Sequence, residues 1–129
     1  MYKNRSKCPI SKGLDLIGDQ WSLLILRDVI FYDKHSYSAF LGGEEGIATN
    51  VLSQRLKKLT DTGILYKFNK KYQLSPKGLE LIPVLIHLLR WSFDYSSQTE
   101  ISSEMRQALN DPDGFEAKMR RKFYARMGS

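Results

Sequence analysis

Apolar residues recur at helical spacing through the middle of the chain. Leu52, Leu56 and Leu59 fall at i, i+4 and i+7, which places them on one face of a helix. The residues that point elsewhere are polar: Thr49, Asn50, Ser53, Gln54 and Lys57. Gly63 suits the left-handed position that ends many helices. The pattern therefore predicts an amphipathic helix from about residue 49 to residue 62.

Two short strand-like segments follow this helix. Residues 64–68 and 72–74 flank the turn Asn69-Lys70-Lys71, which predicts a β-hairpin over about residues 64–74. An amphipathic helix followed by a basic hairpin is typical of a DNA-reading helix with a wing.

Three helices are predicted before this unit. Pro9 begins a short helix that ends near Gly18, and Asp19 is a good N-cap for a mostly apolar core helix over residues 20–31. Ser36 can cap a third, short helix that contains Tyr37, and a glycine-rich turn over residues 42–46 separates it from the helix at 49–62. This order predicts a helix-turn-helix.

Further helices are predicted towards the C-terminus. Ser75-Pro76 begins a long helix, which we expect Pro83 to kink. Its apolar stripe is broad enough for part of it to face a second subunit and consists of Leu79, Ile82, Leu85, Ile86, Leu89 and Phe93. Residues 101–110 form the next predicted helix, capped at Ser102 or Ser103. The break over residues 111–114 then leads to a final helix lined by Phe115, Met119 and Phe123.

These elements predict a mainly α fold with a small β-hairpin wing, a winged helix-turn-helix with extra C-terminal dimerisation helices. The length of 129 residues predicts one domain. Within it we expect a mobile arm over residues 1–7, a DNA-binding core over 8–75 and C-terminal dimerisation helices over 76–127. The single cysteine, Cys8, excludes an intrachain disulfide, and no apolar run is long enough to span a bilayer. We therefore expect a cytoplasmic protein without a membrane partner.

The distribution of charge along the chain indicates the kind of partner that the protein binds. The formal net charge is +6, and residues 49–72 carry six basic side chains against Asp61 alone. Such a concentration of positive charge indicates nucleic acid. A second basic run, from Lys118 to Arg126, has a solvated helix face as its ordinary interpretation and a membrane surface as a weaker alternative.

Enzymatic chemistry finds little support. His35 and His87 are the only histidines, and neither has cysteines or carboxylates at metal-ligand spacing. The turn over residues 42–46 carries two glutamates and no Gly-Lys-Ser/Thr, which argues against a phosphate loop. We expect no enzyme activity, no metal and no cofactor.

Three segments resemble the HxlR-type regulators, a MarR-related branch of bacterial winged helix-turn-helix transcription factors. They read CPISKGLDLIGDQWSLLILRD at residues 8–28, GIATNVLSQRLKKLTDTGIL at 46–65 and YQLSPKGLELIPVL at 72–85. The resemblance implies a homodimer, built from the N-terminal segment and the long C-terminal helices, on a pseudo-palindromic operator.

The sequence departs from the family pattern in three places. Ala48 stands where the family usually has serine, so we expect helix capping to pass to Thr49. The hairpin is shorter than usual, which weakens its reach into the minor groove. Residues from about 97 to 127 extend beyond the shared core, and no family role is carried onto them.

The expected partner is double-stranded DNA. In the predicted recognition helix, Asn50 and Gln54 suit adenine contacts, whereas Thr49 and Ser53 suit phosphates. The expected phosphate-neutralising residues of the helix are Arg55, Lys57 and Lys58. Those of the wing are Lys67, Lys70 and Lys71, next to Asn69. A winged helix used only for protein contacts is the alternative.

Cys8 suggests control by an oxidant or electrophile. Lys3, Arg5 and Lys7 lie nearby, positive charge favours the reactive thiolate, and several similar regulators sense such compounds through a cysteine before this proline. Ordinary packing against a dimer partner is the competing interpretation of Cys8. A different route is an aromatic ligand in a cleft between the dimerisation helices and the core, stacked among Trp21, Trp91, Phe93 and Tyr95, although these aromatics suit a plain core as well.

Overall fold

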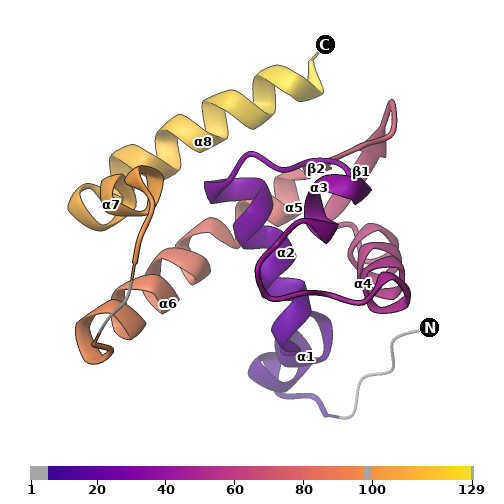
Figure 1. Cartoon of the computed structure of the whole chain (residues 1–129), viewed down its shortest axis with the longest axis horizontal. Coiled ribbons are helices and arrows are strands. Elements are labelled where there is room, and N and C mark those ends of the chain that lie inside the picture. The colour runs from indigo at the N-terminus through magenta and orange to yellow at the C-terminus, as the bar shows by residue number, and fades with distance from the viewer. Residues whose placement is uncertain (1–5, 98–99, 129) are drawn as a thin grey trace.

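The computed structural model describes residues 6–97 and 100–128, and Figure 1 shows the arrangement of the elements. Along the chain these are α1 (Pro9–Ile17), α2 (Gln20–Phe31), α3 (Tyr37–Leu41), α4 (Thr49–Asp61), β1 (Leu65–Phe68), β2 (Lys71–Leu74), α5 (Pro76–Leu79), α6 (Ile82–Tyr95), α7 (Ser103–Asn110) and α8 (Pro112–Met127). Helix α2 runs through the middle, with α3, α4 and the hairpin on one side and α6 and α7 on the other, while α8 runs across the top from α7 toward the hairpin (Figure 1). The predicted fold class, a mainly helical winged helix-turn-helix, is confirmed.

Side-chain caps begin most of the helices. Asp19 accepts hydrogen bonds from the backbone nitrogens of Trp21 and Ser22, at 3.0 and 2.9 Å, and so caps α2 as predicted. The caps of α3, α5, α7 and α8 are Ser36, Ser75, Ser102 and Asp111. Because these side chains satisfy amide groups that have no partner inside the helix, the local sequence fixes where each of these five helices begins.

The core forms around α2. Leu26 and Val29 of this helix are fully buried, and Leu52, Leu56 and Leu59 meet them from α4. The apolar face predicted for residues 49–62 is therefore confirmed. From the other side, Phe115 of α8 stacks on Phe31 with 5.2 Å between the ring centroids. The C-terminal helices thus complete a core that α1 to α6 would leave open.

Two glycines shape the passage from α4 into the hairpin. Gly63 has φ +78° and closes α4 as predicted, since the nitrogens of Gly63 and Ile64 donate to the carbonyls of Thr60 and Leu59. At Gly78 a Cβ would overlap the carbonyl oxygen of Ile64, so only glycine lets α5 approach the hairpin this closely. Gly63 thus shapes the passage from α4 into the hairpin, and Gly78 lets α5 pack on the base of the hairpin.

The hairpin is a two-stranded antiparallel sheet with a two-residue turn. Leu65 pairs with Leu74 and Phe68 with Lys71, which leaves Asn69 and Lys70 at the turn with φ of +52° and +65°. Positive φ at both central residues gives the turn a twist that suits a tight hairpin.

The long helix predicted from residue 76 is two helices. α5 ends at Leu79, and α6 begins at Ile82 with Pro83 in its first turn. Proline has no N–H to donate to the preceding turn, and its ring collides with the carbonyl four residues earlier. Since a first turn needs no such donor, a new start before Pro83 is less costly than the kink that we predicted.

Capping of α4 also differs from the prediction. Its N-cap is Ala48, which has no side-chain acceptor, and Thr49 is the first residue of the helix instead of its cap. The helix therefore begins where the family pattern puts it, without side-chain capping of the first amides.

Candidate nucleic-acid interface

The polar face of α4 is open to solvent. Thr49, Asn50, Ser53, Gln54 and Lys57 are all exposed, while the apolar face of the same helix packs on α2. The structure thus brings together on one surface most of the residues predicted for the recognition helix. Such a surface can present amide, hydroxyl and ammonium groups to base edges and phosphates.

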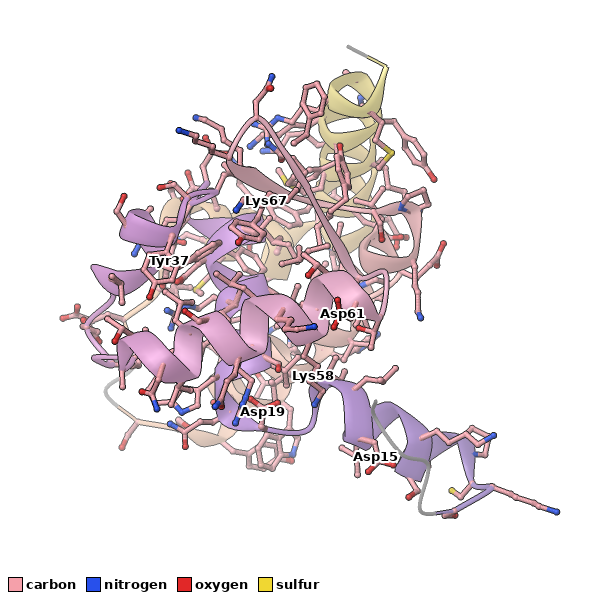
Figure 2. All side chains as sticks on the ribbon, turned by 90° about the vertical axis from the view of Figure 1, so that its right-hand side faces the viewer. Asp15, Asp19, Tyr37, Lys58, Asp61 and Lys67 are labelled. Carbon is pink, nitrogen blue, oxygen red and sulfur yellow. The ribbon has the colours of Figure 1, made fainter. Side chains whose placement is uncertain are left out.

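Two predicted DNA contacts, Arg55 and Lys58, lie on the side of α4 that faces α2. Arg55 Nε donates to Asp19 Oδ1 at 2.9 Å, and Lys58 Nζ lies 3.8 Å from Asp19 Oδ2. Figure 2 shows Asp19 and Lys58 on one side of α4 and Tyr37 and Lys67 on the other. The side chains of Arg55 and Lys58 are 28% and 16% exposed, so contact with DNA stays a prediction for both.

Asp19 is the anionic centre of this contact. Burial alone would raise its pKa, but hydrogen bonds from the side chain and backbone of Ser22 and from Arg55 outweigh burial and lower the pKa to about 2. The carboxylate thus caps α2 and holds α4 with one charge, which fixes the recognition helix on the core.

The wing presents the predicted basic residues. Lys67, Asn69, Lys70 and Lys71 are all exposed, and Lys67 Nζ lies 5.3 Å from the centre of the Tyr72 ring. Phe68 also stands out at the tip of the wing with 59% of its surface exposed. The sequence pattern predicts Phe68 only as a strand residue, and its position next to a basic turn is the signal that could have marked it as a site residue.

A groove of about 290 Å³ separates α4 from the wing. The residues that line it include Tyr37 of α3, Ser53 and Lys57 of α4 and Lys67 of β1. The Tyr37 hydroxyl lies 3.1 Å from the Thr49 carbonyl oxygen and 3.3 Å from Ser53 Oγ. Sequence reasoning missed Tyr37 as a site residue, because only tertiary packing brings α3 to the first turns of α4.

The far side of the wing is tied to the C-terminal helix. Arg126 of α8 donates to the Gln73 side chain at 3.0 Å, and Asp33 contacts both Arg126 and Lys122. Burial would raise the pKa of Asp33, but hydrogen bonds from His35 and Lys122 lower it to about 2. Part of the second basic run is thus paired within the chain, and α8 supports the wing.

The structure divides the residues predicted for dimerisation into two groups. Leu79, Ile82, Leu85 and Ile86 are buried in the core of the chain itself, which leaves them little surface for a second copy. Leu89 and Phe93 are half-buried and line a cavity. The helical stripe was identified correctly, but it meets α2 and the C-terminal helices instead of solvent.

Other apolar residues of α1 and α6 are exposed. On α6 these are Val84, Leu88, Trp91 and Tyr95, with Trp91 at 65% and Tyr95 at 82% exposure. On α1 they are Ile10 and Leu14, and no residue of α1 is buried. Our sequence reasoning missed them because the apolar stripe of α6 runs around most of the helix, and only packing decides which part is covered.

The four aromatic residues predicted for an aromatic-ligand site do not lie together. Trp21 borders a small cavity beside the glycine-rich turn, whereas Phe93 borders a larger one of about 870 Å³ between α2, α6 and α7. Trp91 and Tyr95 are exposed on α6 with their rings 6.2 Å apart. The larger cavity gathers other residues instead, including Tyr32, Leu89 and Met105.

Cys8 is exposed and occupies the N-cap position of α1. Lys7 beside it is exposed as well, whereas Lys3, Arg5 and most of the expected mobile arm lie outside the described residues. Within the described residues, no group of His, Cys, Asp and Glu side chains could hold a metal ion. None of the helices in this part of the chain has the length and apolar character needed to cross a membrane.

Known proteins with this arrangement are regulators of transcription. An uncharacterized HTH-type transcriptional regulator of Synechocystis is 31% identical over 98 residues, which make up 70% of this chain and 72% of that protein. Another, from Mycobacterium tuberculosis, is 28% identical over 70% of this chain and 61% of its own length.

Two solved structures share the fold. PA1607, a candidate transcription factor, superimposes with a TM-score of 0.66 at 31% identity, over 77% of this chain and 74% of its own. The quinone-bound YodB of Bacillus subtilis superimposes with a TM-score of 0.58 at 25% identity, over 68% of this chain and 99% of its own. The HxlR-like helix-turn-helix family matches residues 16–100. The chain therefore belongs to the HxlR-like helix-turn-helix family, whose members are DNA-binding transcriptional regulators and not enzymes.

Proposed function

We propose that this regulator is a homodimer that recognises a pseudo-palindromic operator through α4 and the wing. The observation that carries the proposal is the exposed polar face of α4, with the exposed lysines of the wing beside it. A helix of this kind fits the major groove of B-DNA, and the lysines suit the phosphates that flank it.

The side chains divide into two roles. Asn50 and Gln54 carry amides that can both donate to and accept from adenine, so they read sequence. Thr49 and Ser53 suit phosphates. Lys57 and the wing lysines neutralise phosphates, which sets affinity and its dependence on salt without specifying bases.

Arg55 and Lys58 have a second role in this proposal. Because both face Asp19, they orient α4 on the core, and contact with phosphate requires them to share or leave that carboxylate. Since burial of a carboxylate without its partner is costly, we expect Arg55 to remain on Asp19 when DNA binds.

Homodimer formation is supported by the exposed apolar residues of α1 and α6. Trp91 and Tyr95 of α6 present two large aromatic surfaces to water, and Ile10 and Leu14 present aliphatic surface on α1, a helix that buries no residue. Such surfaces mark interaction sites in proteins. Two copies of the recognition helix then match two half-sites one or more helical turns apart.

We further propose that modification of Cys8 by an oxidant or electrophile controls binding. Cys8 is exposed and directly precedes α1, so a group added to its sulfur changes the element that we assign to dimerisation. The likeness to YodB, which was solved with quinone bound, agrees with an electrophile as the signal. A small aromatic ligand in the cavity beside Tyr32 and Phe93 is the second candidate, because that cavity joins α2 to α6.

Selection of bound sequences from a random duplex pool tests the proposal. We expect an enriched, pseudo-palindromic site, and repeating the selection with Gln54→Ala should relax the preference at one base pair of each half-site. Selection with oxidised protein should give weaker enrichment. If no sequence is enriched although the protein is folded, the winged helix serves protein contacts instead.

A further inference from the structure

We propose that the groove between α4 and the wing binds a single phosphodiester of the operator backbone. Lys67 and the hydroxyl pair of Tyr37 and Ser53 form this site together. This inference rests on the proposed function and names a contact that combines three elements of the fold. The groove of about 290 Å³ opens on the side of α4 away from Asp19.

The walls of the groove have the chemistry of an anion site. Lys67 lies on the wing side and Lys57 on the α4 side, and no acidic side chain among the described residues lines the groove. Asp61, which does not line the groove, forms an ion pair with Lys57, with 2.6 Å between Asp61 Oδ2 and Lys57 Nζ. The charge of Lys57 is therefore already partly neutralised. Lys67 Nζ lies over the ring of Tyr72, which also lines the groove, so the ring helps to hold the ammonium group beside it.

Counting protons identifies the hydroxyl that can donate. The Tyr37 and Ser53 hydroxyls carry one proton each, and both lie near the Thr49 carbonyl oxygen or each other. The Tyr37 hydroxyl donates its proton to the Thr49 carbonyl oxygen, so the Ser53 hydroxyl is the one that keeps a proton for an incoming phosphate oxygen. Thr60 also borders the groove, but its hydroxyl donates to the carbonyls of Leu56 and Lys57 at 2.9 Å. Thr60 therefore serves as a matched control.

The same arrangement explains why Tyr37 belongs to the site. Its hydroxyl touches the first turn of α4, whose amides have no side-chain cap because Ala48 precedes them. A phosphate held at Ser53, which Tyr37 orients, and at Lys67 fixes the distance between the wing and the start of the recognition helix. Electrostatic contacts of this type set the register of a protein on DNA.

The test uses the selected operator with single methylphosphonate groups, which remove the charge of one phosphate at a time. We expect wild-type protein to lose affinity at each contacted phosphate, and to lose about tenfold at the one position in each half-site that enters the groove, the size of one strong contact to a charged group. Ser53→Ala and Lys67→Ala should bind the unmodified operator about tenfold more weakly and lose little more at that same position. Lys67→Ala should also lower the slope of log affinity against log salt by about one.

Thr60→Val should behave as wild type at every position, and circular dichroism melting confirms that each variant is folded. If Ser53→Ala and Lys67→Ala lose as much as wild type at every methylphosphonate, the proposed phosphate site is refuted while the proposed function stands. If wild-type protein binds no duplex at all, the proposed function itself fails and the proposed phosphate site fails with it.

Discussion

Asp19 Oδ1 accepts a hydrogen bond from Arg55 Nε at 2.9 Å, while it also caps α2. The start of the core helix and the middle of the recognition helix are therefore held by one carboxylate. Any change at residue 19 reaches the DNA-binding surface through Arg55, although neither side chain needs to touch DNA.

Replacing Asp19 with alanine should lower the free energy of unfolding by about 1 to 2 kcal/mol. The loss combines an N-cap with a partly exposed ion pair. Asp19→Asn is the matched variant, because asparagine caps nearly as well but carries no charge, and it should cost less than about 1 kcal/mol. Urea unfolding measures both. Equal losses for the two variants would show that the cap contributes nothing.

The lowered pKa of Asp19 predicts a loss of stability in acid. The folded-state pKa is about 2 against an ordinary value of 3.8, so between these values the unfolded chain binds a proton that the folded chain does not. The stabilisation is therefore complete above the ordinary value and is lost as the pH falls through it towards about 2.

Urea unfolding over this pH range compares the wild type with Asp19→Asn. The dependence of the unfolding free energy on pH should be shallower in the variant. Asp33 titrates in the same range, since its pKa is also lowered to about 2, and Asp33→Asn serves as the parallel measurement. Identical pH profiles for wild type and Asp19→Asn would contradict the assignment.

Replacing both Lys70 and Lys71 with alanine should lower the slope of log affinity against log salt by about one to two, because each phosphate contact contributes about 0.9. Both side chains are exposed at the turn of the wing. Fluorescence anisotropy with the selected operator measures the slope. The control is the double variant Arg106→Ala and Lys118→Ala, which removes one positive charge from α7 and one from α8. It should leave the slope of log affinity against log salt unchanged. A wild-type slope in the wing variant would remove these lysines from the interface.

Trp91→Glu should convert the dimer to a monomer. Trp91 is 65% exposed on α6, and a buried, unpaired carboxylate at a subunit interface is costly. Sedimentation velocity measures the mass. Tyr124→Glu is the control, since Tyr124 is 49% exposed on α8 and lies outside the proposed interface. A dimer that survives Trp91→Glu would place the interface elsewhere.

Diamide should weaken operator binding by wild-type protein and leave Cys8→Ser unaffected, because Cys8 is the single thiol of the chain. Non-reducing electrophoresis shows whether a disulfide joins two copies, and dithiothreitol should restore binding. If the fully oxidised protein binds the operator with unchanged affinity, the sensor proposal is wrong, and control by a ligand in the cavity beside Tyr32 is favoured.

The local elements could be predicted from sequence because their signals are local. Asp19, Ser36 and Ser75 satisfy amides within three residues of themselves, and Gly63 supplies a left-handed residue directly after α4. The leucine spacing of α4 fixed which of its faces is buried. Two local predictions were wrong: the cap of α4, which is Ala48 and not Thr49, and the kink at Pro83, where a new helix begins instead. At both places the local sequence is compatible with more than one backbone geometry.

The choice between core and interface could not be made from sequence. Ile82 and Leu88 are both apolar residues of α6, yet Ile82 is fully buried and Leu88 is 45% exposed. The difference arises because α2, α7 and α8 cover one side of α6 and leave the other uncovered. Periodicity reports that a face is apolar, and it does not report what meets that face.

By itself the sequence determined the family through three matching segments, and it determined the order of the helices, the amphipathic helix α4 and the basic wing through short-range spacing, capping and charge. Tertiary structure alone decided that Arg55 turns to Asp19 and that Tyr37 joins Ser53 and Lys67 around one groove. Arg55 and Asp19 lie 36 positions apart in the chain, and Tyr37 and Ser53 lie 16 apart. Only the packing of α2, α3 and the wing around α4 brings such distant residues within reach of one another.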